Sequence, residues 1–151
     1  MSHFRPFVVF LTLAAAAMAF GAYFTPGPWY AALEKPALTP PNWLFPVVWP
    51  ILYLAMAIAA TLAWRKRPQI TTVAPWLVQL VLNALWSWLF FGLQRPALAF
   101  LEITLLWIAI VVNIVVFYRI HKGAAGLLMP YLAWVSFASW LNWQLWHLNA
   151  P

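Results

Sequence analysis

Five long apolar runs dominate this chain, and few charged residues interrupt them. Only 7% of the residues are charged, whereas a soluble domain has about a quarter of its residues charged. A chain of this composition cannot cover a water-facing surface, so we expect an integral membrane protein. Each run approaches the ~20 residues that an α-helix needs to cross a bilayer. The expected spans are residues 7–24, 46–64, 74–93, 97–118 and 126–148.

Short connections join most of these runs, so consecutive helices are expected to be neighbours in a bundle. We therefore predict an all-α fold in which residues 1–151 form a single five-helix membrane domain. The first run has a rival interpretation as a cleavable signal peptide, because Ala17, Met18 and Ala19 resemble a small-residue cleavage site. The run continues beyond this site to Phe24, which favours a retained helix.

The basic residues predict how the chain lies in the membrane. Five spans place six of them on one side: Arg5, Arg65, Lys66, Arg67, Arg119 and Lys122. The other side holds only Lys35 and Arg95. The positive-inside rule then places the N-terminus in the cytoplasm and the first loop on the opposite side. Because the basic residues form short clusters at the ends of the runs, we expect no nucleic-acid partner.

The stretch from Trp29 to Tyr53 is too rich in aromatic residues and prolines for a plain solvent loop. Prolines remove backbone donors and fix φ, so this stretch cannot be one continuous helix. Our hypothesis is a folded lid over a pocket between the helices, which runs into a span that begins near Pro46. The alternative is an interfacial aromatic belt, which is common in membrane proteins.

Residues for acid–base or metal chemistry are scarce. Glu34 and Glu102 are the only acids, there is no cysteine, and the three histidines lack metal-ligand spacing. We therefore expect no metal site and no ordinary hydrolytic or phosphoryl-transfer chemistry. Glu102 lies inside a span, where an ionisable group is a functional candidate. The interpretation that we favour is an ion pair with Arg95 or Lys35.

Aromatic and polar residues recur at helical spacing in three of the spans, and residues three or four apart share a helix face. They are Trp49 and Tyr53 in the second span, Gln79, Asn83, Trp86 and Ser87 in the third, and Tyr131, Trp134, Ala138 and Asn142 in the fifth. We expect these faces to line one cavity beneath the lid that suits a flat hydrophobic ligand. Alternatively, the tryptophans only pack, and Asn83 and Gln79 only join helices.

Three segments carry a resemblance to a known family: WYAALEKPALTPPNWLFPVVWPILY, LNALWSWLFFG and PYLAWVSFASWLN. They resemble the translocator protein family, also called the tryptophan-rich sensory protein or peripheral-type benzodiazepine receptor family. The resemblance covers nearly the whole chain. It implies a five-helix bundle, often a homodimer, whose ligand pocket is closed by the first loop. It also implies ligands such as protoporphyrin IX, haem, sterols and synthetic drugs, with no required cofactor.

The resemblance assigns the pocket position by position: Tyr30, Pro40, Trp49, Tyr53, Asn83, Trp86, Ser87, Trp134 and Ala138. Some bacterial members degrade protoporphyrin IX in light, and the two tryptophans that they use match Trp49 and Trp134. The sequence departs from the family at the sterol motif of the last span, where residues 143–147 offer no Tyr, Lys or Arg.

Three functions therefore remain open from the sequence. The first, which we favour, is a membrane protein that binds porphyrins or similar flat ligands for transport or sensing. The second is a light-dependent enzyme that degrades protoporphyrin IX. The third is a regulatory partner of another membrane protein, with a vestigial pocket. For each, we expect a bacterial cell membrane, since helical spans argue against the outer membrane.

Overall fold

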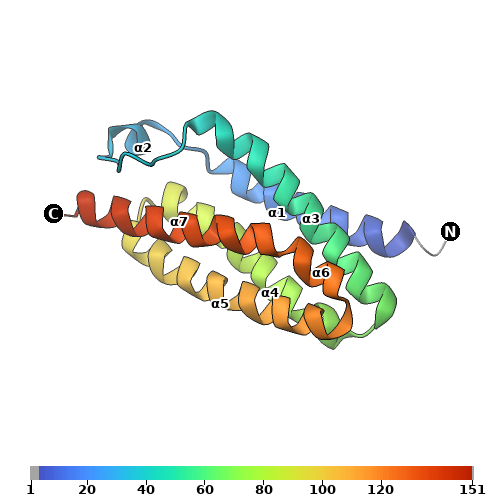
Figure 1. Cartoon of the computed structure of the whole chain (residues 1–151). Coiled ribbons are helices and arrows are strands. Elements are labelled where there is room, and N and C mark those ends of the chain that lie inside the picture. Colours follow the sequence, from blue (N-terminus) through green and yellow to red (C-terminus); the bar gives the residue numbers. More distant parts are fainter. Residues whose placement is uncertain (1–3, 151) are drawn as a thin grey trace.

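The computed structural model describes residues 4–150, which are almost entirely helical. The long helices are α1 (Phe4–Tyr23), α3 (Phe45–Lys66), α4 (Ile70–Ser87), α5 (Pro96–Ile120) and α7 (Met129–Leu148). Shorter elements are α2 (Pro28–Ala32), the 3₁₀ turn η1 (Asn42–Leu44), the π turn η2 (Trp88–Gly92) and α6 (Lys122–Leu127). Together they form one elongated bundle, with the two termini at opposite ends (Figure 1).

Five helical segments are long and apolar enough to cross a membrane: Phe4–Tyr23, Asn42–Lys66, Ile70–Gly92, Pro96–Ile120 and Lys122–Leu148. The chain is therefore a multi-pass membrane protein, and the predicted five-helix fold is confirmed. Proline occupies the first turn of α3, α5 and α7, where its missing N–H has no intrahelical partner to lose. Arg65 and Lys66 end α3, where positive charge complements the helix dipole.

Two spans are less regular than expected. The third starts four residues early, at Ile70, because Thr72 continues the helix and its hydroxyl donates to the Arg67 carbonyl at 2.8 Å. The same span widens into a π turn, in which the Leu93 N–H donates to the Trp88 carbonyl at 2.8 Å. The fifth is divided at Leu128 into α6 and α7. Hydropathy marks apolar length and cannot show such local changes of helix type.

The packing of the helices leaves a space at one end of the bundle. α1 packs along α3 and α4, and α5 packs along α4 and α7. α3 contacts α6 closely but diverges from α7, the helix that follows. Between α6 and the middle of the bundle the core is solid, with Met56, Trp76, Phe117 and Tyr131 completely buried. Beyond that level, toward α2 and the C-terminus, α3 and α7 separate (Figure 1).

Candidate functional site

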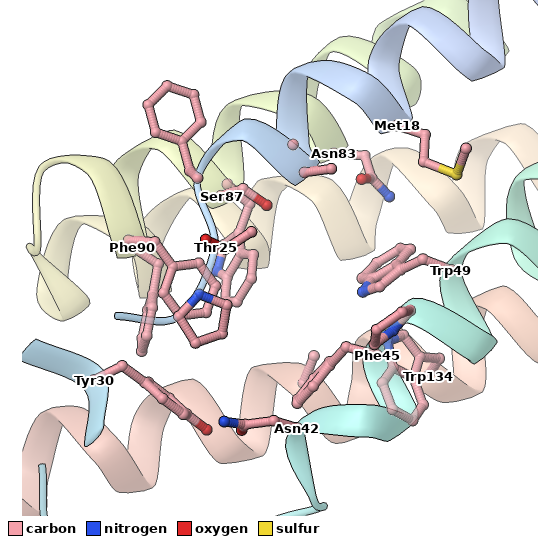
Figure 2. A pocket seen from close by; sticks show the side chains of 18 of the residues that line it. Met18, Thr25, Tyr30, Asn42, Phe45, Trp49, Asn83, Ser87, Phe90 and Trp134 are labelled. Carbon is pink, nitrogen blue, oxygen red and sulfur yellow. The ribbon is translucent and has the colours of Figure 1, made fainter. Parts of the chain in front are cut away.

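A cavity of about 560 Å³ occupies the space between α3 and α7, within the ~300–1,000 Å³ typical of small-molecule sites. Helices α1, α3, α4 and α7, the π turn η2 and the α1–α3 connection all contribute to its wall. Figure 2 shows side chains from these elements around the open space. None of the described residues that line the cavity carries a charge.

The structure brings together eight of the nine pocket residues expected from the sequence. They are Tyr30, Trp49, Tyr53, Asn83, Trp86, Ser87, Trp134 and Ala138. Pro40 is not among the described residues that line this cavity. It lies in the part of the connection before η1, and Asn42 at the start of η1 reaches the cavity instead.

Flat aromatic rings form two walls of the cavity. Trp49 and Trp134 meet edge to face, with ring centroids 6.4 Å apart and an interplanar angle of 89°. On the α4 side, Trp86 stacks on Phe90 at 5.1 Å with an angle of 22°. Phe45 completes the first wall against Trp134 at 5.9 Å. These walls present broad apolar faces that match a flat aromatic ligand.

A hydrogen-bonded chain of polar side chains closes the deep end of the cavity. The Tyr53 hydroxyl donates to Asn83 Oδ1 at 2.6 Å, and Asn83 Nδ2 donates to the Tyr131 hydroxyl oxygen at 2.6 Å. The Tyr131 hydroxyl donates in turn to Gln79 Oε1 at 2.8 Å. The chain joins α3, α4 and α7 in an apolar environment, where such bonds hold helices together. Asn83 thus both lines the cavity and joins helices.

A second polar pair fixes Trp86. Its Nε1–H donates to Asn142 Oδ1 at 2.9 Å, and Asn142 Nδ2 donates to the Pro96 carbonyl at 2.9 Å. The indole therefore presents its face to the cavity while its polar edge is bonded. Trp134 differs, because its Nε1 is buried without a hydrogen-bond partner in the described part of the chain.

The expected lid is folded and attached to the rest of the bundle. Tyr30 on α2 is only 4% exposed and packs against Phe90 and Phe91, with ring centroids at 6.4 and 5.5 Å. Burial raises the pKa of the Tyr30 hydroxyl. Further along, the Glu34 N–H donates to Asn149 Oδ1 at 2.8 Å and Asn149 Nδ2 donates to the Glu34 carbonyl at 2.9 Å. This pair of bonds ties the lid to the C-terminal end of α7.

Sequence reasoning missed the contribution of α1. Met18, Gly21 and Ala22 line the cavity, and Gly21 lies so close to α4 that a Cβ there would stand 3.4 Å from the Ser87 hydroxyl oxygen. A uniformly apolar run gives no periodic signal that would have marked this face. Because α1 forms part of the wall, removal of the first run by cleavage would open the cavity on this side.

The expected ion pair of Glu102 is wrong. Glu102 is 7% exposed, and neither carboxyl oxygen has a hydrogen-bond partner within residues 4–150. Its side chain lies on the face of α5 that packs into the bundle, with Ala99 and Ile103. The Lys35 ammonium is engaged elsewhere, since it donates to the Leu33 carbonyl at 3.0 Å and lies 4.8 Å from the Tyr30 ring centroid.

The geometry suits binding better than acid–base chemistry. Within residues 4–150, no group of three or more His, Asp or Glu side chains is placed to hold a metal ion. The cavity supplies aromatic and aliphatic surfaces with a few hydroxyl and amide groups.

The comparisons with known proteins agree with this geometry. The TspO/MBR family model matches residues 8–147. Protein CrtK of Rhodobacter capsulatus is 41% identical over 147 residues, which is 95% of this chain and 92% of that protein. The tryptophan-rich protein TspO of Chlorobaculum tepidum is 46% identical over 136 residues, 85% of this chain and 86% of that protein. The translocator protein of Homo sapiens is 37% identical over 126 residues, covering 80% and 75% respectively.

Proposed function

Because the chain belongs to the TspO/MBR family, we propose that it is a membrane translocator or sensor that binds porphyrins, such as protoporphyrin IX or haem, inside the helix bundle. Similar flat hydrophobic molecules bind in the same cavity through contacts with its aromatic walls. The names of the relatives include tryptophan-rich protein TspO and translocator protein. They support the part of this proposal that concerns a membrane translocator or sensor.

The observation that carries the proposal is the uncharged cavity between α3 and α7. Its volume of about 560 Å³ suits one porphyrin-sized molecule, and its aromatic walls offer flat faces on two sides. Eight residues that the sequence resemblance assigned to a ligand pocket line this one space. The lid adds Tyr30 to the wall and is bonded to α7, which keeps the mouth of the cavity partly covered.

A titration in the dark tests the proposal. Protoporphyrin IX is added to the detergent-purified protein and tryptophan fluorescence is followed. We expect saturable quenching and about fivefold weaker binding in Trp134→Phe, because one aromatic contact contributes about 1 kcal/mol. Trp140→Phe is the matched control, since Trp140 is on the same helix but is exposed and not part of the cavity wall. Absence of saturation, or equal affinities in both variants, would contradict the proposal.

A second candidate function is light-dependent degradation of protoporphyrin IX. The supporting observation is that the ring centroids of Trp49 and Trp134 lie 6.4 Å apart on the cavity wall, where both rings would contact the same ligand. An excited porphyrin can transfer energy to dioxygen or take an electron from a neighbouring indole. Dioxygen is then the oxidant that the reaction consumes.

Illumination of the bound complex separates the two functions. If the protein degrades its ligand, porphyrin absorbance falls faster than in protein-free detergent, and only when dioxygen is present. Replacing both Trp49 and Trp134 by Phe should return the rate to that of free porphyrin. Stable absorbance in the wild type, or an undiminished rate in the double variant, would remove the enzymatic candidate and leave binding for transport or sensing.

A further inference from the structure

Hydrogen-bonding groups are distributed unevenly along the cavity. At the deep end, Tyr53 and Asn83 are bonded to each other, and Trp86 is bonded to Asn142. At the lid end, the Tyr30 hydroxyl and the Asn42 amide line the cavity but make no side-chain hydrogen bond within the described part of the chain. A hydroxyl and an amide therefore remain available to a ligand side by side under the lid.

Tyr30 is held in place as a hydrogen-bond donor. Its ring packs against Phe90 and Phe91, and the Lys35 ammonium lies 4.8 Å from its ring centroid. Burial raises the pKa of the phenol, so the hydroxyl retains its proton at neutral pH. Although the residue is almost fully buried, its side chain forms part of the cavity wall.

Asn42 approaches the same point from a separate segment of the lid. It begins η1 immediately after Pro41, whose backbone is extended, and the chain then enters α3 at Phe45. Figure 2 shows the hydroxyl end of Tyr30 and the amide of Asn42 directed toward one another at one end of the pocket. The two groups make no hydrogen bond to each other, so both can bond to an atom of a ligand at this end of the pocket.

The electrostatics at this position favour an acceptor with negative charge. Neither of the two acids in the chain, Glu34 and Glu102, lines the cavity. The Lys35 ammonium, which is positively charged, lies beside Tyr30, 4.8 Å from its ring centroid. A carboxylate accepts hydrogen bonds only, so a phenol O–H and an amide N–H are suitable partners for its two oxygens.

We propose that Tyr30 and Asn42 form a subsite for a carboxylate on the edge of a flat hydrophobic ligand, which orients the ligand with its acidic edge under the lid and its apolar edge toward Trp49 and Trp134. This inference rests on the proposed binding function and extends it to the class of ligand, a hydrophobic acid. Since the two donors belong to α2 and η1, a bound carboxylate also connects two segments of the lid.

The test compares protoporphyrin IX, which carries two carboxylic acids, with its dimethyl ester, which has the same ring without the charges. Both are titrated in the dark against wild type, Tyr30→Phe and Asn42→Ala. Wild type should bind the diacid about tenfold more tightly than the ester, because hydrogen bonds to charged groups are the stronger ones. Each variant should lose several-fold in affinity for the diacid and little for the ester. The ratio of the two affinities should therefore fall toward one.

Tyr118→Phe is the control for loss of a phenol, because Tyr118 is exposed at the opposite end of α5 and should keep the full preference. If Tyr30→Phe and Asn42→Ala weaken the binding of the diacid and of the ester equally, the two side chains only pack, and the proposed subsite is overturned. Wild type that binds both porphyrins equally would overturn the subsite while leaving the proposed function intact. Wild type that binds neither would overturn both.

Discussion

The deep end and the lid end of the cavity contain similar residues but differ in how those residues are engaged. At the deep end, Tyr53, Asn83, Tyr131 and Gln79 bond one another across α3, α4 and α7. At the lid end, Tyr30 and Asn42 leave their polar groups open to the cavity. Both ends combine tyrosine with a side-chain amide, yet one holds helices together and the other is available to a ligand.

This difference follows from the surroundings of each end. Inside the membrane no water satisfies a polar group, so polar side chains between packed helices find one another. Where α3 and α7 diverge, the aromatic rings cannot close the gap, and polar groups face empty space. A membrane bundle can therefore be held together by hydrogen bonds at one end and bind a ligand at the other. The predictions that follow test this division.

The largest effect is expected at the deep end. Asn83→Ala removes two hydrogen bonds of 2.6 Å and leaves the buried Tyr53 and Tyr131 hydroxyls without their amide partner. The free energy of unfolding should fall by about 2–3 kcal/mol. Thermal unfolding in detergent measures this, with Ser87→Ala as the control. Ser87 lines the cavity on the same helix, and its side chain makes no hydrogen bond within residues 4–150. Equal losses of unfolding free energy in both variants would show that the hydrogen bonds at the deep end do not stabilise the bundle.

Glu102 provides a test of opposite sign. Its carboxyl group is buried on the inner face of α5 and has no hydrogen-bond partner in the described part of the chain, so replacement by an apolar side chain should stabilise the bundle. We expect Glu102→Leu to raise the free energy of unfolding by about 1–2 kcal/mol while porphyrin affinity stays unchanged, since Glu102 does not line the cavity. Loss of binding in a stable variant would show that Glu102 acts on the ligand.

The smallest effect is expected at the attachment of the lid. Asn149→Ala removes both bonds to the Glu34 backbone, at 2.8 and 2.9 Å, and one to the Leu145 carbonyl in the last turn of α7. It should loosen the lid and leave the rest of the helices unchanged. Losing these exposed bonds weakens the closed lid by about 1 kcal/mol, so porphyrin should dissociate about fivefold faster in stopped-flow fluorescence. The melting temperature should change little. Unaltered dissociation would mean that the lid does not control exchange.

Several features of the site could be predicted from the sequence because they are periodic within one helix. Trp49 and Tyr53, or Trp134 and Ala138, are four residues apart and must share a face. Their meeting in one cavity required that α3 and α7 face the same space from opposite sides. Asn83 was predicted either to contact a ligand or to join helices, and the structure gives it a place in both settings.

Other features depended on contacts between distant residues and gave no local signal. Asn42 replaces Pro40 at the cavity because of the path of the chain before η1. Asn149 bonds Glu34 across 115 positions of sequence. Glu102 was expected to pair with Lys35 or Arg95 on the basis of depth alone, and depth does not say which way a helix face turns.

Three properties can be read from the amino-acid sequence: the membrane environment, the class of fold and the residues that share each helix face. Hydrophobic length, charge placement and periodicity are properties of single segments, so a single sequence is sufficient to read them. The packing of the helices, in contrast, sets two features that no single segment reveals. α3 contacts α6 and diverges from α7, and a π turn carries Phe90 and Phe91 against Tyr30. These are relations between segments, set by which side chains fit together, and they decide where the bundle closes and where it remains open.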